Sequence, residues 1–328
     1  MTRLNARAAS AALAAAALLA LAACGPTGTE STAVEPTAPG AYPESTSYPD
    51  IPVAADIPYG TADGQPLLLD TCLPAEPVEE ASPRAAIVVI HGGSWQHGDK
   101  SNINWRSVCQ WFASEGFVAV SVNYRLVPAA TFPAQLDDVQ AAVRWLRDDS
   151  QVERYNIDPD RIGAFGGSAG GNLAVEAAIA TGRPAVSWSG IFDLRHIIES
   201  TESAATDPEA APMTQDLDAL KSADIDQTGP DVPFLRWTIL QEVGGDRSLL
   251  EAASTTRHVV AGSGPVYLVN SMHEFVPVDD PAALQRAFAA VGVASTLQLV
   301  PGVHHAEGYT DQAIGGSLQF LADALRRD

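Results

Sequence analysis

The sequence Gly166-Gly167-Ser168-Ala169-Gly170-Gly171 follows a short apolar run at residues 162–165 and precedes an alanine-rich stretch at residues 172–180. A strand, a glycine-flanked serine and a helix in this order are typical of a nucleophile elbow, where glycines allow a sharp turn that presents the serine hydroxyl. We therefore expect Ser168 to act as a nucleophile. A serine hydroxyl is a weak nucleophile at neutral pH, so it needs a base, an acid that orients the base, and donors for a developing oxyanion.

Apolar runs of strand length alternate along the chain with amphipathic stretches of helical period. The clearest helix candidate is residues 134–147, where apolar side chains recur at helical spacing. This alternation predicts an α/β fold with a mostly parallel central sheet flanked by helices. The expected strands are residues 67–73, 86–90, 118–122, 162–165, 185–188, 266–269 and 296–300.

Charge is unevenly distributed along the chain. The 328 residues include 40 acidic and 19 basic side chains, giving a formal net charge of −21. Such a surface argues against nucleic acid and anionic lipid headgroups as partners. Residues 195–246 hold 11 acidic residues against three basic ones and interrupt the alternation between two expected strands. We expect this region to be an acidic cap or insertion above the strand ends, not a separate domain.

Cofactor signatures are missing from the sequence. No Cys or His cluster has metal-ligand spacing, and no Gly-x-Gly-x-x-Gly segment follows an expected strand. Neither a metal nor a nucleotide cofactor is therefore expected.

The N-terminal residues 1–23 have the layout of a lipoprotein signal peptide. Arg3 and Arg7 precede a mostly Ala/Leu stretch at residues 8–23. This stretch is short for a membrane-spanning helix, which is the alternative. Its end, Leu21-Ala22-Ala23-Cys24, resembles a bacterial lipobox, in which a peptidase cuts before a lipid-modified cysteine.

Lipidation of Cys24 would make this an exported protein, anchored to the bacterial cell membrane by acyl chains and facing outward. Residues 24–50 are rich in Pro, Thr, Ser and Glu, so we expect a disordered tether there and a folded domain at residues 51–328.

Export also bears on Cys72 and Cys109, because an oxidising compartment lets a cysteine pair persist as a disulfide. The chain has three cysteines, so these two remain once Cys24 is set aside. We expect a disulfide between them, with two buried free thiols as the alternative.

Oxyanion donors are sought in His91-Gly92-Gly93-Ser94-Trp95, which follows the expected strand at residues 86–90 about 75 residues before Ser168. Glycines there allow backbone N–H groups to approach a tetrahedral oxygen. We expect the amides of Gly92, Gly93 and Ala169 to form an oxyanion hole. His91 is expected to make structural hydrogen bonds in the same turn.

Five segments together resemble the α/β-hydrolase superfamily, in particular the HGG-bearing serine esterases related to hormone-sensitive lipase and to feruloyl and acetylxylan esterase-like proteins. The resemblance covers about residues 65–328 except the acidic insertion. It implies the α/β-hydrolase fold and hydrolysis of a small-molecule ester through an acyl-enzyme. The segments are HGGSW from His91, NYRL from Asn123, FPAQLDDVQAAVRWL from Phe132, DPDRIGAFGGSAGGN from Asp158 and PGVHH from Pro301.

The resemblance also points to the catalytic base. His305 occupies the catalytic position of the family's Pro-Gly-x-Gly-His pattern, and His304 stands where a glycine is usual. We expect His305 to be the general base and His304 at most to line the pocket. Ser94 likewise replaces the third glycine of the usual HGGG run, which leaves the backbone donors in place.

The orienting acid is less directly indicated. Relatives usually carry Asp four residues before the proline of a Val-Pro pair; counting back from Pro277, that position is His273, and Glu274 follows it. We expect Glu274 to be the acid. Asp280 and Asp193 stay open as alternatives, although Asp280-Pro281 also fits a helix N-cap followed by proline at the first helical position.

A displaced acid leaves a second class of function open. The chain could be a hydrolase-fold lipoprotein with weak or no turnover that acts as a binding module. A peptidase or amidase of the same fold is a further alternative, because fold alone does not separate these activities.

Overall fold

The computed structural model describes residues 48–75, 82–204 and 232–326, all within one compact unit. The expected signal peptide, Cys24 and the tether up to residue 47 lie outside the described residues, as do residues 205–231 of the expected cap. The Tyr48 carbonyl accepts hydrogen bonds from Ile51 N at 3.0 Å and from Gln110 Nε2 at 3.2 Å. The Tyr48 backbone is therefore bonded to helix α1 (Ile103–Ser114) of the folded domain.

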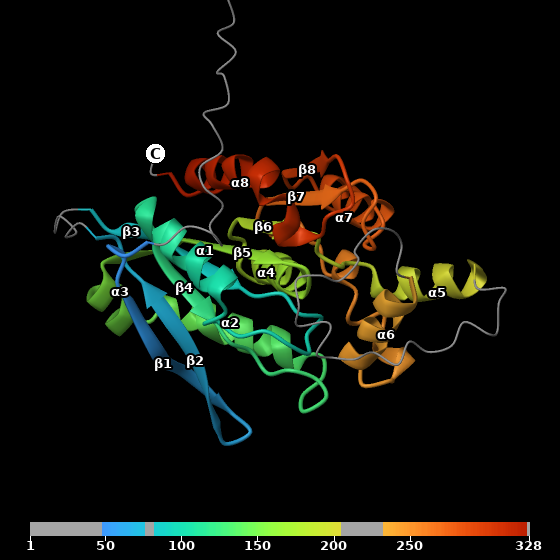
Figure 1. Ribbon diagram of the computed structural model, residues 1–328, viewed down its shortest axis with the longest axis horizontal. Helices are drawn as coiled ribbons and strands as arrows, with labels where there is room; N and C mark the ends of the chain where they lie inside the picture. Colours follow the sequence, from blue (N-terminus) through green and yellow to red (C-terminus); the bar gives the residue numbers. More distant parts are fainter. Residues whose placement is uncertain (1–47, 76–81, 205–231, 327–328) are drawn as a thin grey trace, which may run out of the picture. The chain divides into compact units, whose positions relative to one another are not determined.

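An eight-stranded sheet forms the centre of the domain (Figure 1), with the strand order β1-β2-β4-β3-β5-β6-β7-β8. The strands from β3 to β8 pair in parallel, whereas β1 pairs with β2, and β2 with β4, in antiparallel fashion. This topology confirms the expected α/β-hydrolase fold. The strands are β1 Val53–Ala62, β2 Gln65–Cys72, β3 Arg84–Ile90, β4 Val118–Val122, β5 Ile157–Gly167, β6 Ala185–Trp188, β7 Val266–Ser271 and β8 Ser295–Val300.

Each of the expected strands is present, but strand β1 was not expected. Its apolar alternation is broken by register shifts between Ala54 and Ile57 and between Pro58 and Gly60, so its side chains do not keep a regular period of two. The remaining signal for this hairpin is Asp63-Gly64, which turns from β1 into β2 with positive φ angles of 50° and 75°.

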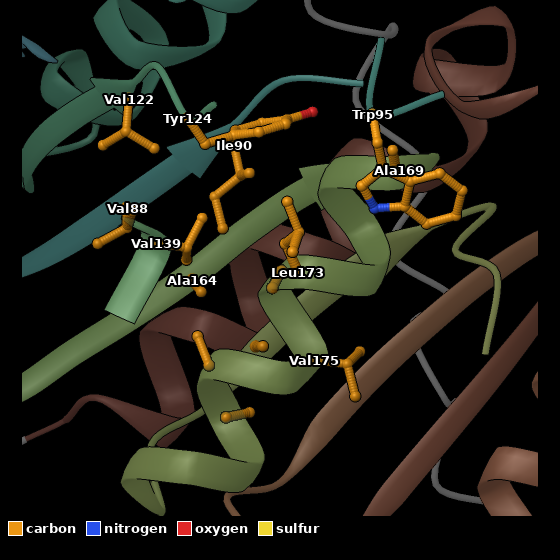
Figure 2. Packing of buried hydrophobic residues seen from close by; sticks show 14 of the residues in the cluster. Val88, Ile90, Trp95, Val122, Tyr124, Val139, Ala164, Ala169, Leu173 and Val175 are labelled. Carbon is orange, nitrogen blue, oxygen red and sulfur yellow. The ribbon is translucent and has the colours of Figure 1, made fainter. Parts of the chain in front are cut away.

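Helices cover both faces of the sheet, because alternate side chains of a buried strand point in opposite directions. On one face Val88 and Ile90 of β3 pack in a cluster with residues of α2, α4 and α7, part of which Figure 2 shows around Leu173. On the other face Ile87 and Val89 pack with residues of α1 and α8. The helices are α1 Ile103–Ser114, α2 Ala134–Leu146, α3 Asp149–Tyr155, α4 Ala169–Thr181, α5 Leu194–Ala204, α6 Val232–Glu242, α7 Asp279–Ala290 and α8 Thr310–Ala324.

The described ends of the acidic region 195–246 are helical. Helix α5 opens the region and α6 closes it. The Phe234 ring of α6 meets Phe275, which follows the carboxyl end of β7, at a centroid distance of 5.6 Å. Helix α6 thus contacts the segment that follows β7, at the carboxyl end of that strand, where an α/β sheet places its ligands. In the parts of the chain that the structure describes, no helix combines the length and hydrophobicity needed to span a bilayer.

Candidate active site

Ser168 lies in the turn between β5 and α4. Its backbone has φ 55° and ψ −124°, and its N–H donates to the Trp188 carbonyl at 2.7 Å. A positive φ is unfavourable for a residue with a Cβ atom, so the surrounding contacts must hold it in place. Gly170 supplies one such contact, because a Cβ atom there would collide with the carbonyl oxygens of Ile90 and His91. The glycine pattern of the elbow is therefore required by close packing against the end of β3.

The HGG loop lies directly beside this serine. A Cβ atom built on Gly92 would come within 3.3 Å of Ser168 Cβ and 2.9 Å of the Gly167 carbonyl oxygen. Gly92 thus approaches Ser168 from the end of β3, Gly93 is its chain neighbour, and Ala169 follows Ser168 at the start of α4. The fold places the HGG loop beside the elbow, and these two segments carry the expected oxyanion donors.

His91 has a structural role in this loop. Its ring is 1% exposed, stacks on Tyr124 at a centroid distance of 4.4 Å, and donates from Nδ1 to the Gly92 carbonyl at 2.8 Å. Burial lowers the pKa of His91 to about 4, against the opposing effect of the Gly92 hydrogen bond. The imidazole is therefore neutral at pH 7 and places no cation behind the expected oxyanion hole.

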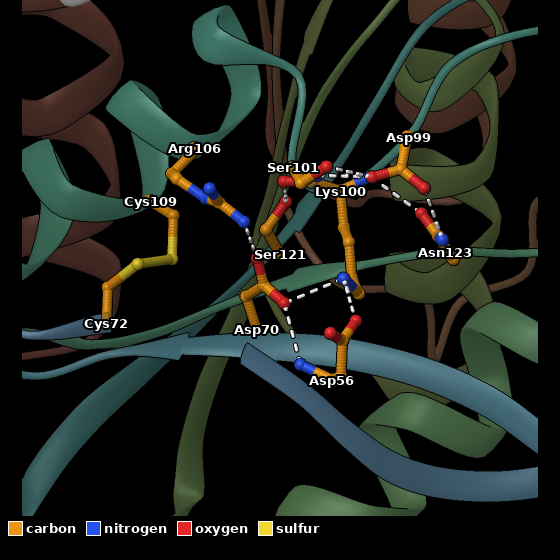
Figure 3. Close-up of polar contacts among 10 residues, drawn as sticks. All are labelled: Asp56, Asp70, Cys72, Asp99, Lys100, Ser101, Arg106, Cys109, Ser121 and Asn123. Carbon is orange, nitrogen blue, oxygen red and sulfur yellow. Dashed lines mark hydrogen bonds and ion pairs between the residues drawn. A yellow bond between two sulfur atoms is a disulfide. The ribbon is translucent and has the colours of Figure 1, made fainter. Parts of the chain in front are cut away.

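A partly buried ion-pair cluster, in which Asp70 and Lys100 are buried, holds the far end of the same loop (Figure 3). Lys100 Nζ lies 2.8 Å from carboxylate oxygens of both Asp70 and Asp56, and Arg106 pairs with Asp70 at 2.7 Å. Burial alone would raise the pKa of Asp70, but the hydrogen bonds from Lys100 and Arg106 outweigh it and lower the pKa. Because Lys100 ends the loop that begins at His91, this cluster fixes the loop against β2.

The disulfide Cys72–Cys109 lies beside this cluster in Figure 3, with the two Cα atoms 5.8 Å apart. It joins the end of β2 to α1, the helix that follows the loop in the chain.

His305 and Glu274 form the second half of the site. His305 Nδ1 donates to Glu274 Oε2, and the two side chains are 8% and 0% exposed. Glu274 Oε1 accepts two further hydrogen bonds, from Ser271 N at 2.9 Å and from Ser189 Oγ at 2.7 Å. Every donor to the carboxylate is buried, which fixes its position relative to the imidazole.

His305 also lies next to the elbow. A Cβ atom built on Gly167 would come within 3.3 Å of Ala306 Cβ, so the residues that adjoin Ser168 and His305 are in contact. Ser168 and His305 are each 8% exposed. The Phe275 ring covers the imidazole at a centroid distance of 4.2 Å. His305 thus lies between the Glu274 carboxylate and the elbow, which is the order of groups in a hydrolytic triad.

The residues that the sequence left open as alternatives make hydrogen bonds other than to His305. Asp280 accepts from the backbone N–H groups of Phe192 at 2.8 Å and Asp193 at 2.7 Å. Asp193 accepts from His196 N at 3.0 Å and so caps α5. The His304 side chain is exposed, and its carbonyl accepts from Ser271 Oγ at 2.6 Å. Of the carboxylates considered, only Glu274 bonds to His305.

One expectation about Asp280 was wrong. Helix α7 begins at Asp279 after Val278 as N-cap, so Asp280 lies inside the first turn and not at the cap. The carboxylate instead bonds to amides of another segment, because it is buried there with 2% exposure and must find donors.

Two residues near the acid were not anticipated. Ser189 Oγ, besides contacting Glu274, lies 2.7 Å from the Tyr309 hydroxyl and accepts from Ala306 N at 2.9 Å. Ser189 stands directly after an expected strand, at the edge where sites form, and this is the signal that could have found it. Tyr309 carries no local signal. Across the described residues, no group of three or more His, Cys, Asp or Glu is arranged to hold a metal ion.

Comparison with curated proteins finds esterase relatives. Arylacetamide deacetylase of Bos taurus is 37% identical over 126 residues, covering 36% of this chain and 32% of the relative. Esterase LipQ of Mycobacterium tuberculosis is 28% identical over 292 residues, covering 86% of this chain and 64% of the relative. The chain thus spans about a third of the length of the first relative and under two thirds of the second.

Solved structures share the fold. Esterase B from Lactobacillus rhamnosis superposes with a TM-score of 0.64 at 22% identity, covering 85% of this chain and 89% of that one. A truncated carbohydrate esterase from gut microbiota gives a TM-score of 0.63 at 20% identity, with 84% and 97% covered. The BD-FAE family model matches residues 69–288, which include the HGG loop, Ser168 and Glu274. The chain therefore belongs to the BD-FAE family, on an α/β-hydrolase fold.

Proposed function

We propose that this protein is a serine carboxylic-ester hydrolase that acts on small-molecule esters through an acyl-enzyme intermediate. One observation carries the proposal: His305 is bonded to the buried carboxylate of Glu274 and lies against the elbow that holds Ser168. Membership of the BD-FAE family and the esterase names of the relatives support it.

The reaction has two halves. Ser168 Oγ attacks the ester carbonyl while His305 Nε2 takes its proton, and the carbonyl oxygen, now negative, accepts from the amides of Gly92, Gly93 and Ala169. His305 then gives the proton to the departing alcohol. In the second half His305 takes a proton from water, the hydroxide attacks the acyl-enzyme, and the proton returns to Ser168 as the acid leaves.

Glu274 acts throughout by holding His305 in one tautomer. Because the carboxylate accepts the Nδ1 proton, Nε2 is left as the acceptor that faces the nucleophile, and the positive imidazolium that forms is stabilised. The displacement of the acid by one position along the chain is offset by the longer Glu side chain.

Hydrolysis of p-nitrophenyl acetate and butyrate tests the activity. We expect turnover by the wild type, none above background by Ser168→Ala, and fluorophosphonate labelling of the wild type alone. Equal rates for both proteins would refute the ester-hydrolase proposal. Labelling without ester turnover, together with cleavage of the matched anilides, would instead identify an amidase or peptidase.

We also propose that the protein is exported and held at the outer face of the bacterial membrane by lipid on Cys24. The lipobox-like sequence ending at Cys24 supports this, and a disulfide between Cys72 and Cys109 suits an oxidising compartment. Metabolic labelling with a fatty-acid probe should mark the wild type and not Cys24→Ser. Equal labelling, or recovery of both proteins in the cytoplasmic fraction, would contradict the proposal.

A further inference from the structure

The hydrogen bond to Glu274 does not by itself fix the plane of the His305 imidazole. His305 Nδ1 donates to Glu274 Oε2, which holds that nitrogen but lets the ring turn about the direction of the bond. The last torsion of a histidine side chain has broad minima, so it does not select one plane either. Proton transfer from Ser168 nevertheless needs Nε2 in a narrow range of directions. A further contact must therefore set the plane of the ring.

The Phe275 ring makes this contact. Its centroid lies 4.2 Å from the centroid of the imidazole, and the two planes differ by 34°, so a face of the phenyl ring lies against the imidazole. Phe275 is itself buried, with 7% exposure. It directly follows Glu274 in the chain. The acid thus holds the Nδ1 edge of the imidazole, and the next residue covers its face.

The backbone on both sides of Phe275 is held by the end of β7. Before it, Glu274 Oε1 accepts a hydrogen bond from Ser271 N at 2.9 Å. After it, the Val276 carbonyl accepts from the buried Asn270 Nδ2 at 3.1 Å. Both donors belong to β7. The phenyl ring between these two points therefore has little freedom to move away from the imidazole.

Helix α6 packs on the same phenyl ring. Phe234, near the start of α6, is 6% exposed and meets Phe275 edge-on, with an interplanar angle of 80° and a centroid distance of 5.6 Å. The other end of the helix is tied down because Phe132 N donates to the Glu242 carbonyl at 2.8 Å. Since α6 closes the acidic region 195–246, this region reaches the imidazole through two aromatic rings.

An aromatic face also suits the charge that the imidazole gains in the reaction. His305 becomes positive when it takes the proton of Ser168. The face of a phenyl ring is electronegative and attracts a cation within about 6 Å, most strongly where water is excluded. The attraction is weak while the imidazole is neutral, so it stabilises the transition state more than the ground state.

We propose that Phe275, held in place by Phe234 of α6, is a positioning residue that sets the plane of the His305 imidazole and stabilises the positive charge of that ring during ester hydrolysis. This rests on the proposed ester-hydrolase function. Phe275 acts only through His305, so its loss should lower kcat and leave KM nearly unchanged. The acidic region thereby takes part in orienting the base.

Three replacements test the proposal by their kinetics. Phe275→Leu stays apolar but loses the aromatic face, so kcat for p-nitrophenyl acetate should fall about tenfold with KM nearly unchanged. Phe234→Leu, one ring further from His305, should lower kcat about threefold. Pentafluorophenylalanine incorporated in place of Phe275 keeps the shape of the ring and reverses the charge of its face. It should lower kcat severalfold with little change in melting temperature.

Phe117→Leu is the matched control. Phe117 is 8% exposed and meets Phe112 edge-on at a centroid distance of 6.0 Å, but it precedes β4, at the edge of the sheet opposite the carboxyl ends of the parallel strands. This variant should lose stability as Phe234→Leu does and keep the wild-type kcat. Equal losses of kcat in Phe117→Leu and Phe275→Leu, or full kcat in folded Phe275→Leu, would overturn the inference. A loss in Phe275→Leu with full kcat in the fluorinated protein would overturn the stabilisation of charge.

A spectroscopic measurement separates the placement of the ring from turnover. The proton shared by His305 and Glu274 should give a low-field NMR resonance in the wild type without substrate. This resonance should broaden in Phe275→Leu, as the ring moves and water enters, but not in Phe117→Leu. An unchanged resonance in Phe275→Leu would overturn the placement of the imidazole by Phe275. A wild type without ester turnover whose resonance still broadens in Phe275→Leu would reject the ester-hydrolase function and retain the role of Phe275 in placing His305.

Discussion

Ser189 Oγ donates a hydrogen bond of 2.7 Å to Glu274 Oε1, although the two residues are 85 positions apart in the chain. The same hydroxyl accepts from Ala306 N, next to His305. One side chain directly after β6 therefore fixes both Glu274 and the segment that carries His305. Its effect on chemistry acts through Glu274 and His305, so Ser189 is a positioning residue.

Ser189→Ala should lower kcat about tenfold with little change in KM, because the carboxylate loses a donor and Ala306 N loses its acceptor. We also expect the free energy of unfolding to fall by about 1–3 kcal/mol. Steady-state kinetics and chemical denaturation measure the two effects. Ser114→Ala, whose hydroxyl bonds only locally to the Trp111 carbonyl, is the control. A loss of stability with unchanged kcat would assign Ser189 a purely structural role.

Glu274→Gln should lower kcat by about 10³ to 10⁴, because an amide can present N–H to His305 Nδ1 and favour the wrong tautomer. Asp280→Asn and Asp193→Asn should retain kcat within about tenfold, since those carboxylates bond to backbone amides and not to the base. The melting temperature of each variant checks that it is folded at the temperature of the kinetic measurement. The largest kcat loss in either Asp variant would move the acid away from Glu274.

His305→Ala should abolish ester hydrolysis, whereas His304→Ala should retain most of it. The reason is geometric: His305 is buried against Glu274, and the His304 side chain is exposed. Imidazole added in solution should partly restore His305→Ala, because it can replace the missing base. If only His304→Ala were inactive, His304 and not His305 would be the general base.

Replacing both cysteines, as Cys72→Ser with Cys109→Ser, should lower the free energy of unfolding by about 4 kcal/mol. This follows from the loop entropy of a bond between cysteines 37 positions apart. Denaturation with and without reductant measures it, and reductant should destabilise only the wild type. We expect the folded double variant to keep its kcat, because the bond joins β2 to α1 away from Ser168. Equal stability with and without reductant would show that the wild-type thiols are free.

Glu242→Gln should stabilise the protein increasingly as pH rises from 5 to 8. The pKa of Glu242 is raised from 4.5 to about 9 by burial, so between these values the native state holds a proton that the unfolded state has released. The contribution of Glu242 to the free energy of unfolding is therefore complete below pH 4.5. It is lost as the pH rises from 4.5 towards 9, by up to about 1.4 kcal/mol per pH unit. Gln does not titrate, so the stability difference between variant and wild type should widen across this range. Urea unfolding at each pH measures it, and a constant difference would show that Glu242 is already ionised.

Sequence reasoning succeeded where the signal was local. The glycines around Ser168 and in the HGG turn form short local patterns that can be recognised, although Gly92 and Gly170 are needed by contacts between the two motifs, and buried parallel strands appear as apolar runs. It failed where the hydrogen-bond partner of a side chain lay far away in the chain. Asp280 fitted a helix cap by its neighbours, yet its carboxylate bonds to the amides of Phe192 and Asp193.

The sequence by itself determined the fold class, the nucleophile turn and the positions where donors, base and acid could be sought. Only the tertiary structure decided which carboxylate meets His305, and it added Ser189, the Lys100 cluster and the buried carboxyl of Glu242. The physical reason is that hydrogen bonds and burial act over a few ångströms in space. Ser189, Glu274 and His305 meet there because parallel strands end at one edge of the sheet, while along the chain they are far apart.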